Sequence, residues 1–67
     1  MTAAQRDRLV AALTEVEVTA MCCTAAVRSQ QRRDEKTRRT DAEVLGWCRE
    51  LGEKHARAQA IAAEVLA

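Results

Sequence analysis

Apolar residues recur along this chain at alternating steps of four and three, once in its first half and again in its second half. Such spacing places the side chains on one stripe of an α-helix and is typical of helices that pack knobs into holes. The stripes comprise Leu9, Leu13, Val16, Ala20, Cys23 and Val27, and then Val44, Cys48, Leu51, His55, Ala58 and Ala62. The chain is therefore predicted to be all-α, an antiparallel two-helix hairpin closed by a coiled-coil-like seam.

Two capping signals set the predicted helix boundaries. Thr2 with Gln5 and Thr40 with Glu43 fit the capping box, in which a Thr hydroxyl accepts a first-turn amide and the later side chain reaches back. The sequence predicts a single domain with one helix over about residues 3–30, an Arg-rich connector over about 31–40 and a second helix over about 41–66.

The seam permits two registers. In the favoured one, facing residue numbers sum to 71 and Cys23 meets Cys48. In the other, they sum to 78, the first helix continues to about residue 37, and Cys23 meets His55. Ion pairs between residues 34 and 38 and between 35 and 39 favour the longer helix by ~0.2–0.5 kcal/mol each. Leaving one Val or Leu unburied forfeits ~1.5–3 kcal/mol, so packing favours the first register.

A second set of apolar residues lies off the predicted seam. A 67-residue chain buries only about 60% of its unfolded surface, and small scaffolds often need another chain to complete a core. Exposed apolar stripes mark contacts with other chains, and Trp is enriched at their strongest points. We expect dimerisation into a four-helix bundle, or docking on a host protein. The predicted interface comprises Val18, Met21, Cys22, Ala25, Leu45, Trp47, Ile61 and Leu66.

The cysteines admit three interpretations. Cys23 on the seam suits gap-filling, since Cys behaves as a small apolar residue, while a disulfide from Cys23 to Cys48 is the second interpretation. The third is a metal or redox site formed by Cys23 and His55 in the slipped register of a dimer, although no familiar zinc spacing is present.

The net charge is only +1, but basic residues gather in the connector. They could contact phosphate, or they could form a solvated hairpin tip. No aromatic residue is interleaved for base stacking. The candidate phosphate-contacting residues are Arg28, Arg32, Arg33, Lys36, Arg38 and Arg39.

Candidate chemistry is otherwise sparse, since the sequence has no Gly-rich phosphate loop and no Cys or Ser with a His at helical contact spacing. We expect a non-enzymatic interaction, adaptor or regulatory module that needs no cofactor. The alternatives are a nucleic-acid-associated regulator that presents its Arg-rich tip, and a Cys/His metal or redox sensor. The polar start of the chain suggests no signal peptide, and no segment is expected to approach a membrane span. Since unpaired thiols suit a reducing compartment, we expect the protein to be cytoplasmic.

Overall fold

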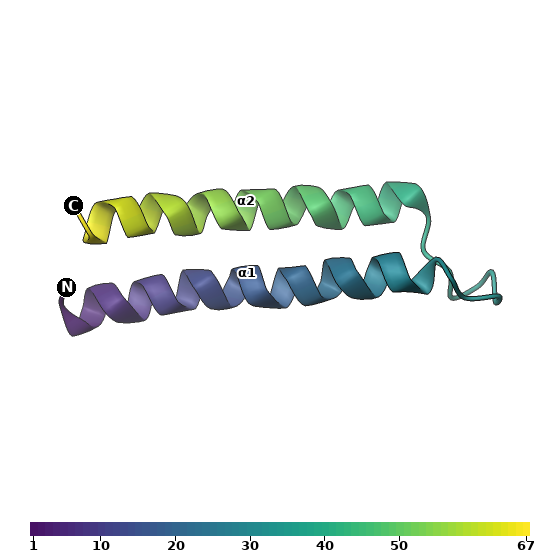
Figure 1. Ribbon diagram of the computed structural model, residues 1–67, viewed down its shortest axis with the longest axis horizontal. Helices are drawn as coiled ribbons and strands as arrows, with labels where there is room; N and C mark the ends of the chain where they lie inside the picture. Colours follow the sequence, from purple (N-terminus) through teal and green to yellow (C-terminus); the bar gives the residue numbers. More distant parts are fainter.

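The computed structural model describes residues 1–67 and contains two antiparallel α-helices, α1 (Ala3–Ser29) and α2 (Asp41–Val65). They lie side by side along a molecule of 49 × 17 × 12 Å, with both termini at one end and the connector at the other (Figure 1). The all-α hairpin is confirmed, and the helix ends agree with the predicted ones to within one residue.

The N-caps form as helix chemistry requires, with one difference. At Thr2 both capping-box bonds are present, from the Gln5 amide to Thr2 Oγ1 and from the Thr2 amide to Gln5 Oε1. At Thr40 the hydroxyl accepts the Glu43 amide at 3.2 Å, and the Glu43 carboxylate pairs with Arg39 at 3.0 Å. The main partner of this carboxylate is therefore Arg39, with the Thr40 backbone as the second influence on it.

The first helix does not continue to residue 37. The hydroxyl of buried Ser29 bonds to the Ala26 carbonyl at 2.6 Å and accepts the Arg39 amide at 3.3 Å, which competes with further helix. Residues 34–38 form a separate turn, in which the Asp34 carboxylate accepts the Lys36 amide. The expected ion pairs of Asp34 with Arg38 and of Glu35 with Arg39 are not among those the structure forms.

Polar contacts across the hairpin define the register. Arg8 pairs with Glu64, Glu15 with Arg57, and the Gln30 amide donates to Asp41, so that the residue numbers sum to 71 or 72. The favoured register is therefore the observed one, and the alternative in which they sum to 78 is excluded.

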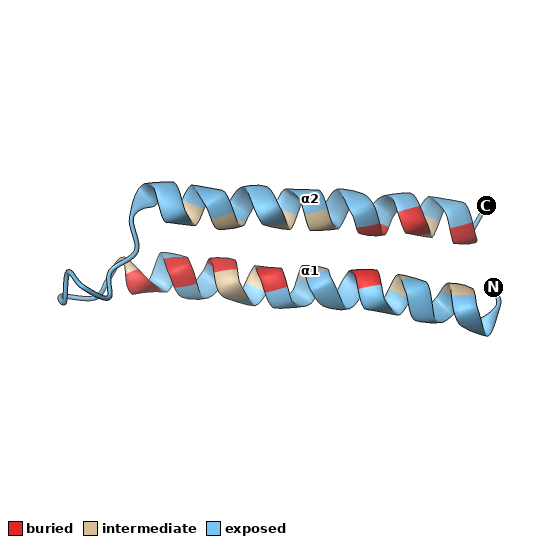
Figure 2. Ribbon diagram, turned by 180° about the vertical axis from the view of Figure 1, so that it is seen from behind, coloured by how far each residue is buried: buried red, intermediate tan, exposed pale blue.

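The buried positions lie on the sides of the two helices that face each other (Figure 2). The seam keeps every second residue of the predicted stripe and moves by one residue at the positions between them, which is a small rotation of each helix. Leu13 and Val27 are 46% and 49% exposed, Cys48 and His55 are exposed, and Ala20 and Ala62 are half-buried. The predicted core positions for Leu13, Val27, Cys48 and His55 are thus wrong. The observed seam comprises Leu9, Ala12, Val16, Thr19, Cys23 and Ala26 on α1, and Val44, Trp47, Leu51, Lys54, Ala58, Ile61 and Val65 on α2.

Side-chain size explains the rotation. Ala12, Thr19 and Ala26 give α1 a shallow stripe, onto which the larger Trp47 and Ile61 of α2 can pack. Alternating large and small side chains across facing positions fills a core better than two stripes of medium size. The core remains thin, because only 8 of 67 residues are buried and no large side chain is completely covered.

Candidate interaction surface

One side of the hairpin carries the ion pairs between the helices. Arg8 Nη1 lies 3.0 Å from Glu64 Oε1, and Glu15 Oε2 lies 3.3 Å from Arg57 Nη1 and 3.6 Å from Lys54 Nζ. We call this the charged side. These contacts are solvent-exposed, so they contribute to orientation and register more than to stability.

The hydrogen bond from Arg8 lowers the pKa of Glu64 and raises the pKa of the guanidinium, with their charge attraction as the second cause. Near the connector, the hydrogen bond from Arg39 is the main cause of the lowered pKa of Glu43, followed by the Thr40 backbone amide. Both carboxylates are therefore held in their ionised form on the charged side.

The opposite side follows from helix geometry. On α1, the charged positions 8 and 15 each come directly before a seam residue, at 9 and 16. Positions 13, 20 and 27 each come directly after a seam residue, at 12, 19 and 26, and helix geometry places them on the opposite flank. Positions 48, 55 and 62 occupy the corresponding flank of α2. Together with outer neighbours they form what we call the apolar side, which carries no ion pair between the helices and is poor in charge, with Arg6, Glu17 and Asp41 as the charged residues at equivalent helical positions. It comprises Val10, Leu13, Ala20 and Val27 of α1 and Leu45, Cys48, His55, Ala62 and Leu66 of α2.

The predicted interface residues divide between different surfaces. Leu45 and Leu66 lie on the apolar side and are exposed. Ile61 is only 6% exposed and Trp47 is half-buried, because both face α1. Ile61 is therefore a core residue of the hairpin, whereas the interface role of half-buried Trp47 stays a prediction.

The remaining predicted interface residues lie away from the apolar side. Val18, Met21 and Ala25 are exposed on α1, and Cys22 is half-buried. The predicted interface residues therefore do not share one surface of the hairpin.

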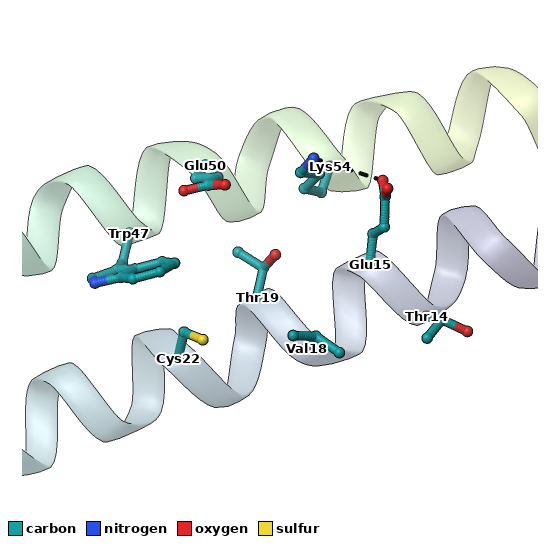
Figure 3. A pocket seen from close by; sticks show the side chains of 8 residues that line it. All are labelled: Thr14, Glu15, Val18, Thr19, Cys22, Trp47, Glu50 and Lys54. Atoms are coloured by element: carbon teal, nitrogen blue, oxygen red, sulfur yellow. Dashed lines mark ion pairs between the residues drawn. The ribbon is translucent and has the colours of Figure 1, made fainter.

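A shallow groove of about 350 Å³ runs along the charged side (Figure 3). The indole of Trp47 forms one wall opposite Cys22, while Lys54 and Glu15 close the far end with their ion pair. The same groove is lined by Val18, Thr19, Thr14 and Glu50. Its charged groups hold the two helices to each other, and the Trp47 ring covers the seam between them.

The thiols are arranged by the register. Burial is the main cause of the raised pKa of Cys23, and the neighbouring Cys48 is the second, so these two residues face each other across the hairpin. Cys23 is buried, whereas Cys48 is exposed. His55 is also exposed, and no group of three or more His, Cys, Asp or Glu side chains could hold a metal ion. The predicted contact of Cys23 with His55 belonged to the slipped register and is not formed.

All six candidate phosphate-contacting residues are exposed at or beside the connector. Their side chains differ in what they contact. Arg39 pairs with Glu43, and Arg38 donates to the Arg32 and Arg33 carbonyls at 2.9 and 3.0 Å. Arg28 and Arg33 lie outside the cavity that the others form at the tip.

By length and composition, α1 could cross a membrane. An 18-residue window has a mean hydropathy of 1.5, and 22% of that window is buried. The expectation that no segment approaches a membrane span is therefore wrong on this measure. Core helices of soluble proteins and N-terminal signal sequences pass the same test, so it is weak evidence for a span.

Comparison of the chain with protein-family models, with curated proteins and with solved structures finds no match. The fold defines a two-helix hairpin with one charged and one apolar side. The core residues Ala12, Thr19 and Ala26 and the apolar side were missed from the sequence. The detectable signal was the row of charges at positions 8, 15, 57 and 64, which identifies one flank of each helix.

Proposed function

We propose that this chain is a small, non-enzymatic interaction module that pairs with a second copy of itself through the apolar side to form a four-helix bundle. The observation that supports the proposal is the segregation of charge. Every ion pair between the helices lies on one side, whereas the other side has nine uncharged residues, and Arg6, Glu17 and Asp41 are the charged residues at equivalent helical positions. Depletion of charge is the compositional mark of an interface core.

The exposed area supports a partner of similar size. The chain exposes 5195 Å², whereas a compact monomer of 7.4 kDa exposes about 4,200 Å². The excess of about 1,000 Å² is close to the ~800 Å² that each partner contributes to an interface of standard size. A second hairpin of the same length presents a matching apolar side along the full length of both helices.

The seam residues give a second reason for pairing. Leu9, Val16, Val44 and Leu51 are only half-buried in the hairpin, since two helices cannot enclose a core. In a four-helix bundle such positions are covered by the facing helices. A bundle would convert a thin seam into a core, with Leu13 and Val27 as added members.

The proposal places the module in the cytoplasm. Glu15 and Glu17 fall in the middle of the apolar stretch of α1, and Glu15 is held by Lys54 and Arg57 of the facing helix. A charged residue at the centre of a membrane span costs about 2.5–3.5 kcal/mol or more. Unpaired thiols on the hairpin also suit a reducing compartment.

Sedimentation equilibrium of Leu13→Glu and Val18→Glu tests the proposal. Both residues lie on α1 and are about half exposed, at 46% and 54%, but only Leu13 lies on the apolar side. We expect the wild type and Val18→Glu to be dimers. Leu13→Glu should be a monomer with its helix content retained, because a two-fold interface would bury the new carboxylate twice without a partner.

Two results would refute the homodimer. One is a wild-type chain that stays monomeric at the highest soluble concentration, which would leave the apolar side for a host protein. The other is dissociation by Val18→Glu with no effect of Leu13→Glu, which would place the contact on the face carrying Val18 and Met21. Circular dichroism of both variants separates loss of pairing from loss of fold.

A further inference from the structure

The connector encloses a cavity of about 330 Å³ at the tip of the hairpin, and no hydrophobic residue lines it. Its lining belongs to the connector and the first turn of α2, and consists of Arg32, Lys36, Thr37, Arg38, Arg39 and Glu43. Four of these six side chains are cationic. The cavity is separate from the apolar side and is formed by one chain alone.

The cavity is shaped by hydrogen bonds within the connector. The Asp34 carbonyl accepts the Thr37 and Arg38 amides at 3.2 and 3.1 Å, and its carboxylate accepts the Lys36 amide at 2.9 Å. The Arg38 side chain then returns to the Arg32 and Arg33 carbonyls. These hydrogen bonds fold the connector back on itself. The basic side chains, which would be far apart in an extended connector, therefore line the same cavity. The Asp34 carboxylate keeps its negative charge, but it is turned onto the Lys36 amide and does not line the cavity.

The charges in the cavity are not balanced. Glu43 is the only acid in the lining, and it is held by Arg39 at 3.0 Å. Arg32, Lys36 and Arg38 form no ion pair. The lining therefore carries a formal excess of three positive charges. Since one phosphate group bears about 1.5–2 negative charges at neutral pH, a single phosphate leaves part of this excess unbalanced, and at least two linked phosphates are needed to neutralise it.

From this geometry we propose that the hairpin tip is a binding site for a compact polyphosphate anion, namely a di- or triphosphate group. Arg32 and Lys36 would hold its oxygens, with Arg38 and Arg39 as the fixed part of the wall. Guanidinium groups bind phosphate through paired N–H donors, and an ammonium group contributes a mobile point charge. The N-terminus of α2 is not needed, since Thr40, Asp41 and Glu43 already occupy it.

A compact anion fits the distribution of charge better than a nucleic-acid strand does. The unpaired cations of the cavity lie at one end of a molecule 49 Å long, whereas Arg8, Lys54 and Arg57 along the helices are paired with Glu residues. Outside the connector, the cations without an ion pair are Arg6, Arg28 and Arg49, so a backbone would find few further contacts along the helices. The lining also has no aromatic residue on which a base could stack.

Isothermal titration of the full chain with sodium tripolyphosphate tests the site. The matched variants are Arg32→Gln with Lys36→Gln, inside the cavity, and Arg28→Gln with Arg33→Gln, outside it. Both pairs remove two positive charges from exposed side chains, and the hydrogen bonds of Arg32 and Arg33 to Arg38 use only their backbone carbonyls. Circular dichroism verifies that both variants fold.

We expect the first pair to weaken binding at least about tenfold, because removal of one charge-assisted hydrogen bond to phosphate lowers an affinity by a factor of this order. The second pair should weaken it less than about threefold, through screened long-range charge alone. No binding by the wild type, or an equal loss in both pairs, would overturn the proposal. The proposal would also be overturned if the chain bound a single-stranded oligonucleotide more tightly than tripolyphosphate and both double variants weakened that binding equally. That result would indicate a nucleic-acid strand contacting the whole connector. The proposal does not depend on pairing of the chain.

Discussion

Replacement of Ile61 by Ala should strongly destabilise the hairpin, since this side chain closes its main apolar cluster. Ile61 is 6% exposed and packs with Ala12, Ala58 and Val65. The substitution removes three carbon atoms at about 0.8 kcal/mol each, or about 2.3 kcal/mol after allowance for the exposed fraction. The cavity left behind adds to this, but a thin core can partly collapse, so we expect a loss of about 2–3 kcal/mol. A domain of this length has about 3–10 kcal/mol of stability in total.

The matched control is Leu13→Ala, which removes the same number of carbon atoms from a side chain that is 46% exposed. In the isolated hairpin it should cost no more than about 1.3 kcal/mol by the same reasoning. At high protein concentration its cost should approach that of Ile61→Ala, because pairing would cover Leu13. Urea unfolding followed by circular dichroism at low and high protein concentration measures both values.

A particular result would refute the assignment of the seam. If Ile61→Ala costs under about 1 kcal/mol while Leu13→Ala costs more at every concentration, the core lies on the predicted stripe and the rotation is wrong. If both costs are large and independent of concentration, the seam is supported but Leu13 is buried within one chain. The proposed pairing would then lose its main support.

Two further predictions concern titratable groups. Cys48 is exposed, whereas burial and the neighbouring thiol raise the pKa of Cys23. Iodoacetamide at neutral pH should therefore alkylate Cys48 first in dilute protein, as read by peptide mass mapping, and equal rates would contradict the observed seam. The pKa of Glu64 is lowered from 4.5 by Arg8, so its stabilising contribution is present above pH 4.5 and is lost as the pH falls through the lower folded value. Glu64→Gln should reduce the loss of stability on acidification, and an unchanged pH profile would show that this pair contributes nothing.

The boundaries of the fold could be predicted because they depend on local chemistry. A Thr followed three residues later by Gln or Glu marks a helix start without reference to the rest of the chain, and both starts form at the expected residues. The end of α1 was also close to the prediction, although for an unexpected reason. Arg38 and Asp34 use their side chains to build the connector instead of extending the helix with an i,i+4 pair.

The face of each helix that meets the other could not be predicted in the same way. Leu13 and Val27 make a better apolar stripe than Ala12 and Ala26 when α1 is read alone. The choice depends on α2, whose largest residue, Trp47, needs small residues opposite it. Periodicity counts apolar positions, but packing depends on the volumes of facing side chains, and these are known only once both helices and their register are set.

The same rotation governs the cysteine pair. Cys23 lies on both the predicted and the observed stripe, so its burial was predictable. Cys48 lies only on the predicted one, and the structure turns it outward while keeping it beside Cys23. Adjacent Cys22 faces Trp47 in the groove of the charged side. The adjacent thiols therefore lie on different surfaces, one in the seam and one in the groove that the indole also lines.

The two proposals together predict how the hairpins pair. If the tips met at one end of the bundle, two cavities with an excess of three positive charges each would repel one another. Pairing with the tips at opposite ends separates them by up to the 49 Å length of the molecule, far beyond the screening distance of about 8 Å at physiological salt. We expect this antiparallel arrangement, so tripolyphosphate should leave the dimer dissociation constant unchanged. A dimer that tightens on addition of tripolyphosphate would show that the tips lie together, because by linkage an anion that relieves their repulsion must favour pairing. Sedimentation of the wild type with and without tripolyphosphate distinguishes the two arrangements.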